Sequence, residues 1–406
     1  MWRHSCVLIG VVGSLLCILP GDLAAQSDST TARRAPPHAE ALARIGRSGL
    51  RALLSASGGI GDLQNRAGSY RNAVQMERAR VGPLQGRLVG LDERLADPDL
   101  SVEERAAVLQ LRASTLAELE AIPRYEAAYS TATLQLEAML PFGMLGARPV
   151  FLLVRGRGHG RGAGTDRLTV FSEQLDVTAV LVASPRWVLG IGTGLGTTEV
   201  DIGAFDGSSN ATSRGFQLYA GRIIADGWSV AAQAGHAWTN GRSTIVRPSG
   251  AGPVEVRSEG DSKAITAKLG VRGRFALVES RGTSLVARPS AVALLMTTHA
   301  RPTTNSLGET GSGPFGERET LAALRGGVAL EAGTGAWTPS VYLGWERELT
   351  DEMSVRVRDP SAVLGSAGLT WTWGRGRRAI LEYGYLHGLE GLRRVSDLTL
   401  IVLIDG

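Results

Sequence analysis

Residues 368–389 alternate apolar and polar side chains, and this alternation constrains the fold of the chain more than any other feature. Trp371 and Trp373 lie two residues apart before a basic turn, and Tyr383 and Tyr385 repeat the spacing after it. A period of two is the pattern of a β-strand whose two faces differ. Four aromatic side chains on one face of a single hairpin indicate a face that meets an apolar solvent.

Strand-like segments of this kind fill the chain from residue 148 onwards. Short connections, such as those at 184–186, 226–227 and 374–376, alternate with longer polar ones along the whole set. Up-and-down outer-membrane barrels have short turns at one end and long loops at the other. We therefore expect an all-β, 12-stranded, antiparallel transmembrane β-barrel over 148–406. Its predicted strands are 148–157, 167–183, 187–199, 214–225, 228–240, 263–275, 284–299, 319–333, 337–350, 362–373, 377–388 and 395–405.

The two faces of these segments differ in chemistry. In 263–275, Ile265 and Leu269 share one parity, and Thr266 and Lys268 share the other. A barrel in lipid needs apolar side chains outside and polar ones inside, because hydrocarbon cannot solvate charge. The charges expected to face the lumen are Lys268, Arg272, Arg274, Arg288, Arg325, Glu331, Glu346, Glu348 and Glu382.

These lumen charges allow three interpretations. The basic set on earlier strands could face the acidic set on later strands and create a field across a pore, as in selective channels. Alternatively, the charges could hold a central helix, or they could simply be solvated in a wet lumen. The helix charges available for the second arrangement are Glu118, Glu120, Arg124, Glu126 and Glu137.

Tryptophans gather at the ends of the predicted strands that adjoin short turns. Tryptophan is enriched where a membrane meets water, because its ring is apolar and its N–H needs a polar partner. The sequence therefore predicts an interfacial aromatic belt at one end of the barrel. Its members are Trp187, Trp228, Trp337, Trp371 and Trp373.

The N-terminus has the features of a secretory signal peptide over residues 1–25. Basic residues precede an apolar run that ends before Pro20, and small residues precede Gln26. Cys6 and Cys17, the two cysteines of the chain, both fall inside it. We therefore expect export by the general secretory route, a mature chain without disulfides, and a polar linker over 26–39.

Residues 40–140 have the periodicity of helices. Asp97-Pro98 ends one predicted helix, and Ser101 with Glu104 forms a capping box for the next. We expect a helical, coiled-coil-like hairpin that continues to residue 140. The apolar stripes of its two helices contain Leu84, Leu88, Leu91 and Leu95, and Val108, Leu111, Leu116, Leu119 and Ile122.

The C-terminal part resembles the β-barrel domain of autotransporters, the type V secreted proteins. The resemblance rests on "GHAWTNGRSTI" (235–245), "ARPSAVALLMTTHA" (287–300), "YLGWEREL" (342–349) and "LEYGYLHG" (381–388), in their order across the predicted strands. It implies a barrel of the Gram-negative outer membrane, inserted by the barrel-assembly machinery and surrounded by outer-membrane lipid. It also implies a pore helix over 122–140 and an N-terminal passenger displayed at the cell surface, whose ligand stays unknown.

Motifs for chemistry are few. No zinc-protease spacing and no Gly-x-Ser-x-Gly elbow occurs, and no basic block with interleaved aromatics suggests nucleic acid. We expect no enzyme activity, no cofactor and no metal site. Two alternatives stay open: a porin-like channel with a periplasmic helical hairpin, and an outer-membrane hydrolase using His236 or His299.

Overall fold

A computed structural model gives the fold of the chain. It describes residues 81–121, 127–163, 168–184, 186–202, 207–225, 227–249, 252–280, 282–311, 318–350, 359–373 and 377–405. The predicted signal peptide, the linker and the helical region before residue 81 lie outside the described residues.

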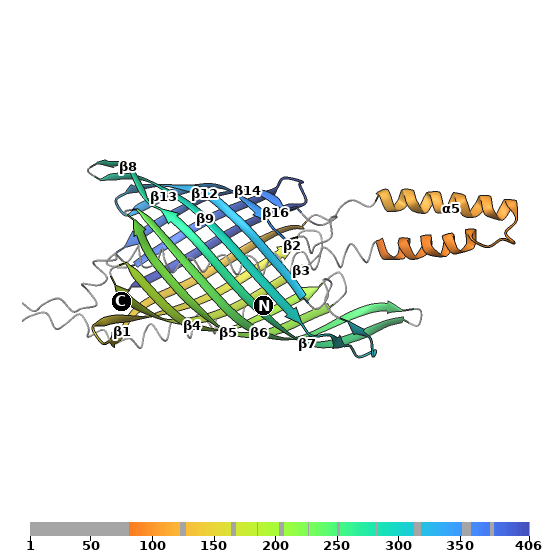
Figure 1. The fold of residues 1–406 in the computed structure, drawn as a ribbon, viewed down its shortest axis with the longest axis horizontal. Helices are drawn as coiled ribbons and strands as arrows, with labels where there is room; N and C mark the ends of the chain where they lie inside the picture. Colours follow the sequence, from red (N-terminus) through yellow and green to blue (C-terminus); the bar gives the residue numbers. More distant parts are fainter. Residues whose placement is uncertain are drawn as a thin grey trace, which may run out of the picture.

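The strands form one closed barrel, which Figure 1 shows from the side. The ring contains 13 strands, and the short strand β8 continues the line of β7 beside β9. The strands are β1 (Ala127–Leu145), β2 (Arg148–Ala163), β3 (Leu168–Ser184), β4 (Trp187–Ile202), β5 (Gly207–Ala225), β6 (Trp228–Ser249), β7 (Gly252–Gly273), β8 (Phe275–Ser280), β9 (Thr283–Ala300), β12 (Arg318–Thr334), β13 (Trp337–Glu348), β14 (Ser361–Trp373), β15 (Arg377–Gly388) and β16 (Arg393–Asp405). A separate two-stranded ribbon consists of β10 (Thr303–Thr304) and β11 (Thr310–Gly311).

The ring closes by a parallel pair. β1 runs parallel to β16, with Ala127 opposite Arg393 and Met139 opposite Asp405, whereas the other neighbours in the ring are antiparallel. An odd number of up-and-down strands requires one such parallel contact. The start of β1 and the end of β16 therefore lie at opposite ends of the barrel.

The expected count of 12 strands is wrong by one, and the error lies at β1. Each of the twelve predicted segments overlaps a strand of the ring for most of its length. Residues 127–140, expected to continue a helix into the pore, instead form most of β1. Their alanines, leucines and glutamates favour a helix in isolation, but strand pairs on both sides satisfy the backbone of this segment.

Several expected long loops are mostly strand. The predicted connection at 241–262 is the outer part of the β6–β7 hairpin, which pairs continuously from Trp228 opposite Gly273 to Ser249 opposite Gly252. This hairpin projects beyond the barrel at the end opposite β8 (Figure 1). The residues of this outer part are mostly polar, because a hairpin outside a membrane needs no apolar face.

The outer surface is apolar. Ile265 and Leu269 on β7 are 57 % and 53 % exposed, whereas Lys268 between them is 9 % exposed and faces the lumen. On β13, Leu343 is 69 % exposed and Glu346 only 1 %. The expected division into an apolar outer face and a polar inner face is therefore present.

Two aromatic levels bound this apolar surface. Trp337 and Trp371 stack at the short-turn end, with ring centroids 5.6 Å apart. Trp345 lies eight residues further along β13 and is 53 % exposed. A strand rise of about 3.4 Å and a tilt of about 40° separate the two levels on β13 by about 21 Å. Outer-membrane barrels carry an apolar band of about 25 Å, so the surface fits one.

In the described residues before β1, two antiparallel helices lie side by side (Figure 1), one at 81–95 and the other α5 (Val102–Ala121). Figure 1 shows them beyond the end of the barrel from which the β6–β7 hairpin projects. Leu84 and Leu91 are buried against α5, and Arg112 pairs with Asp92 at 2.7 Å. The seam on α5 differs from expectation, because Thr115 is buried and Leu111 is 46 % exposed. Among the described residues, no helix is long and apolar enough to cross a membrane.

The capping box at the start of α5 provides a test of the hairpin. The Ser101 amide and hydroxyl donate to one Glu104 carboxylate oxygen at 3.1 and 2.7 Å, and the Glu104 amide donates to the Ser101 hydroxyl at 3.2 Å. These hydrogen bonds hold the pKa of Glu104 below its ordinary value of 4.5. Because the pKa is lower in the folded state, the stabilisation is full above pH 4.5 and is lost as the pH falls through the lowered pKa.

We expect Ser101→Ala to speed amide hydrogen exchange in the first turn of α5 by roughly fivefold at neutral pH, the effect of a typical lost cap. Acidification should lower the protection factor of the same turn in the unmodified chain, that is, the intrinsic exchange rate divided by the observed rate at each pH. Hydrogen exchange followed by mass spectrometry measures both. Glu103→Gln removes a neighbouring acid outside the box, and an equal effect there would contradict a specific cap.

Candidate functional site in the barrel lumen

The lumen changes character along its length. Side chains of β1 and β2 point inward in cross-strand pairs, from Met139 beside Leu153 near the short turns, through Glu137 beside Arg155, to Thr133 beside His159. Each of these pairs lies further from the short-turn end than the one before it. The inner wall therefore passes from apolar to charged to neutral polar.

An apolar cluster occupies the short-turn end of the lumen. Phe151 is 1 % exposed and Val180 is 0 % exposed, although both have the inward parity. Their neighbours in the cluster come from β1 to β4 and β6, which form one arc of the wall. The cluster contains Met139, Phe151, Leu153, Val180, Val182, Val188 and Ala231.

A charged layer lies above the apolar cluster. Arg155 and Glu137 form an ion pair at 3.1 Å, with side-chain exposures of 6 % and 8 %. The Gln135 amide donates to the same Glu137 carboxylate at 3.3 Å, and Arg157 donates to the Gln135 carbonyl oxygen at 3.1 Å. Buried charges need such partners, because desolvation costs several kcal/mol, on the order of the strongest single interactions in a protein.

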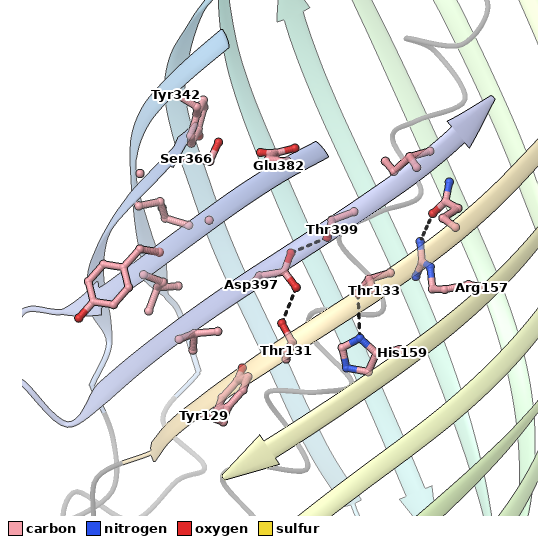
Figure 2. A pocket seen from close by; sticks show the side chains of 18 of the residues that line it. Tyr129, Thr131, Thr133, Arg157, His159, Tyr342, Ser366, Glu382, Asp397 and Thr399 are labelled. Carbon is pink, nitrogen blue, oxygen red and sulfur yellow. Dashed lines mark hydrogen bonds between the residues drawn. The ribbon is translucent and has the colours of Figure 1, made fainter. Parts of the chain in front are cut away.

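A polar cavity of about 440 Å³ opens next to this layer, on the wall made by β15, β16, β1 and β2. Asp397 lies at its centre (Figure 2) and accepts hydrogen bonds from the Thr131 hydroxyl and, at 2.7 Å, from the Thr399 hydroxyl. The Thr133 hydroxyl bonds the His159 ring at 3.0 Å. The lining thus offers hydroxyl, carboxylate, imidazole and guanidinium groups, with Tyr342, Ser366 and Glu382 on the neighbouring wall.

Glycines of β4 widen the lumen beside a second cavity of about 150 Å³. A Cβ at Gly194 would lie 2.3 Å from a carboxylate oxygen of Asp176, and one at Gly192 would lie 2.4 Å from the Thr178 hydroxyl. Side chains on β4 are therefore excluded by inward groups of β3. These glycines allow the Asp176 carboxylate to lie along the wall and accept the Gln174 amide at 2.9 Å.

The long-loop end contains a buried ion-pair cluster. Glu346 accepts Arg325 at 2.7 Å and Arg393 at 2.9 Å, and Arg393 also donates to Glu348. The side chains of Glu346, Glu348 and Arg393 are between 0 % and 3 % exposed. This cluster joins β12, β13 and β16, three strands that do not all touch one another directly in the ring.

Asp359 fastens the turn that precedes Arg393. It is 0 % exposed, and its two carboxylate oxygens accept the backbone amides of Glu390 and Leu392 at 3.2 and 3.0 Å. The turn between β15 and β16 is therefore fixed at the barrel mouth by a buried carboxylate.

With the barrel and its lumen described, comparison with known proteins decides the family. The family model for the Autotransporter beta-domain matches residues 155–378, more than half of the chain. The chain belongs to the autotransporter β-domain family. Its members are outer-membrane barrels of Gram-negative bacteria.

Solved structures of autotransporter barrels are similar to this chain. The translocator domain of NalP from Neisseria meningitidis shares 13 % identity at a TM-score of 0.41, covering 60 % of this chain and 83 % of that one. The β-domain of the Bordetella autotransporter BrkA shares 17 % identity at a TM-score of 0.44, covering 63 % and 94 %. The transport unit of AIDA-I from Escherichia coli shares 13 % identity at a TM-score of 0.38, covering 60 % and 86 %. A comparison with curated proteins gives no match.

The charges expected in the lumen of this autotransporter barrel are paired sideways. Arg288 bonds Glu331 at 2.8 Å between β9 and β12, and Arg325 bonds Glu346 on the adjacent strand β13. Opposite charges therefore neutralise each other along the wall, rather than facing one another across a pore. Lys268 and Arg272 are also inward-facing, and Glu382 lines the larger cavity.

Some expected lumen roles do not agree with the structure. Arg274 lies in the break between β7 and β8, where it is exposed and its amide donates to the Gly227 carbonyl at 2.6 Å. It therefore lies at the rim of the autotransporter barrel. Glu118 pairs with Arg87 in the helical hairpin at 3.5 Å, and Glu137 lies in β1, so neither belongs to a pore helix. Arg124 and Glu126 lie outside the described residues.

The five expected belt tryptophans all lie at the short-turn end. Trp187 receives the Arg222 guanidinium over its ring at 4.9 Å, and Trp228 meets Phe275 edge-on at 5.4 Å. Trp371 stacks on both Trp337 and Trp373, at 5.6 and 4.7 Å. The stacked rings of Trp337, Trp371 and Trp373 form a continuous cluster over β13 and β14.

The two histidines considered for hydrolysis face outward. The His236 ring lies 4.2 Å from Trp238 and 6.0 Å from Phe216, which is 47 % exposed on the apolar surface. His299 has the parity of the exposed Leu295. A catalytic pair needs both groups at one sheltered site, and this position on the lipid side of the autotransporter barrel does not provide it.

Sequence reasoning missed the two residues that organise the barrel mouth. Asp359 and Arg393 lie in or beside connections, and their partners, in a turn for Asp359 and on β13 for Arg393, are 31 to 47 residues away. An Asp before a strand is an ordinary turn residue, so no local pattern marks it. Arg393 does share the inward parity of Asp397 on β16, which was a usable signal.

Proposed function

We propose that the chain is an outer-membrane autotransporter-type barrel that carries its N-terminal helical segment to the cell surface and holds it there. The barrel has no chemistry of its own in this proposal. The barrel-assembly machinery inserts it, and outer-membrane lipid surrounds it.

The parallel pairing of β1 with β16 is the observation that supports the proposal. Because of it, the helices before Ala127 emerge at the end opposite the C-terminal Asp405. Outer-membrane barrels keep their short turns in the periplasm. The short turns here share an end with Asp405, so that orientation leaves the helices outside.

Cysteine labelling tests this orientation directly, because both native cysteines fall in the predicted signal peptide. Asp99→Cys introduces a thiol in the turn between the helices, and Arg186→Cys introduces one in a short turn at the other end. Both positions are exposed. We expect a membrane-impermeant maleimide to label the first on intact cells and the second only after the outer membrane is opened.

Other patterns of labelling would decide against display. Labelling at position 186 alone on intact cells would mean the reverse orientation. Protection of both positions until the membrane is opened would mean that the helices turn back to the periplasmic side, away from the end of the barrel at which β1 begins. That result would favour a channel with a periplasmic hairpin over surface display.

A further inference from the structure

A row of outward-facing residues crosses five consecutive strands of the ring. Arg214 on β5 pairs with Trp238 on β6, which pairs with Lys263 on β7, then His299 on β9 and Arg318 on β12. Residues directly opposite one another in a sheet point to the same side. Three cations and an imidazole therefore flank one tryptophan on a single face.

That face is the outer one. Ile265, two residues from Lys263, and Leu295, four residues from His299, are 57 % and 40 % exposed on the lipid side. The intervening parity is inward, since Leu294 is 3 % exposed. Arg214, Lys263 and Arg318 are themselves exposed.

The row begins at the outer aromatic level. Trp238 lies ten residues from Trp228 along β6, or about 26 Å along the barrel axis for a usual strand rise and tilt. Strand ends show that the row moves away from the short turns. Trp187 is the first residue of β4 and lies opposite Arg222, and β5 continues for three more residues beyond that pair. Trp228 is the first residue of β6 and lies opposite Gly273, and β8 continues the line of β7 beyond that pair. A tilt of about 40° raises the row by about 3 Å per strand, into the lipid head groups.

The charge of this face is one-sided. Within the described part of the chain, Arg214, Lys263 and Arg318 have no ion-pair partner. The outward acids on these five strands all lie on β7 beyond Lys263, and Glu259 among them is held by Arg242 at 2.8 Å. The outward acids Glu173 and Glu199 lie on β3 and β4 instead.

We propose that this row binds the phosphate groups of the phosphorylated glycolipid in the outer leaflet. Lysine and arginine are the side chains that bind phosphate, and long basic side chains beside apolar surface extend their charge toward head groups. Beneath the row, the rings of Phe216, His236 and Trp238 contact one another within 6.0 Å. This apolar platform suits the acyl chains of the same lipid, while Trp238 reaches its saccharide.

The proposal rests on the proposed orientation only in assigning the row to the outer leaflet, and it does not require surface display of the helices. Binding can be measured on the full-length barrel in detergent micelles, where neither orientation nor display matters. Native mass spectrometry with bisphosphorylated lipid A as the probe reports bound lipid per barrel. Phosphatidylglycerol and dephosphorylated lipid A are the comparison lipids.

We expect one bisphosphorylated lipid A to bind the unmodified barrel, and the dephosphorylated form to bind far more weakly. The triple variant Arg214→Gln, Lys263→Gln and Arg318→Gln should weaken binding roughly a hundredfold, from about fivefold for each basic residue near a charged lipid surface. Arg347→Gln is the matched control. Arg347 also faces outward and donates to the Ser361 hydroxyl at 2.7 Å, but it lies outside the row. Its cross-strand partner is Leu324, which is six residues from Arg318 along β12.

Equal binding by the triple variant and the Arg347→Gln control would overturn the proposal. So would equal binding of dephosphorylated lipid A to the unmodified barrel, because the site would then not recognise phosphate. Equal binding of phosphatidylglycerol would also overturn it, because the site would then accept any anionic phospholipid. The lipid comparisons use the unmodified chain, so they stay decisive even if the triple variant folds poorly. A failure of surface labelling with intact lipid binding would refute display and leave this site standing.

Discussion

Glu346→Ala is expected to lower the free energy of unfolding of the barrel by about 3–5 kcal/mol, the usual cost of removing one partner from a buried ion pair. The carboxylate accepts Arg325 and Arg393, and it is 0 % exposed. Its loss leaves the guanidinium of Arg393 buried with one fewer acceptor at the barrel mouth. Urea unfolding in lipid vesicles, followed by tryptophan fluorescence, measures the effect.

Glu382→Ala is the matched control, because Glu382 also points into the lumen but is exposed there. We expect it to change stability by less than about 0.5 kcal/mol. The triple variant Glu346→Leu, Glu348→Leu and Arg393→Leu, which replaces all the buried members of the cluster, should recover much of the loss, since apolar residues often replace buried ion pairs at little cost. Equal destabilisation by Glu346→Ala and Glu382→Ala would contradict a role for the cluster.

Phe151→Ala is expected to open the short-turn end of the lumen to ions. Phe151 is 1 % exposed at the centre of an inward apolar cluster, and apolar constrictions block ions because they exclude water. We therefore expect the unmodified barrel to conduct little in a planar bilayer and the variant to conduct clearly more. Truncation should also cost about 3–5 kcal/mol of stability, as for other buried phenylalanines.

Leu181→Ala separates a change in the lumen from general loosening of the barrel. Leu181 neighbours Val180 and Val182 on β3 but has the opposite, outward parity. Its truncation should leave conductance unchanged, and migration of unheated samples in gels reports whether each variant is folded. High conductance by the unmodified barrel, or no change in Phe151→Ala, would place the block elsewhere.

The strands were predictable from the sequence because every second side chain of a strand in a membrane barrel faces lipid and must be apolar. Trp337, Val341 and Leu343 have to be apolar to face lipid, so the period of two was legible along β13 without any knowledge of its neighbours. The same reasoning identified the inward charges, because a charged side chain that faced outward would lie in hydrocarbon. Both inferences depend on the solvent and not on the partner strand.

Features that depend on partners were not predictable in the same way. β1 alternates Thr131, Thr133 and Gln135 inward with Ala132 and Leu134 outward, but its composition also favours a helix. Only the free edges of β2 and β16 decide between the two, and neither edge is visible in the local sequence. The ion pairs depend on which strands become neighbours. The sequence was therefore equally consistent with opposite charges facing one another across the lumen and with opposite charges paired along its wall.

The thirteenth strand has a consequence for how the molecule is made. In a barrel with an even number of strands, both chain ends return to the side on which the strands began, and no terminal segment needs to cross. Here Ala127 and Asp405 lie on opposite sides of the layer that the barrel spans. In the proposed orientation, closing the ring through β1 and β16 therefore goes together with carrying the N-terminal end of the chain to the cell surface. The structure resembles, in this respect, a helical membrane protein with an odd number of spans.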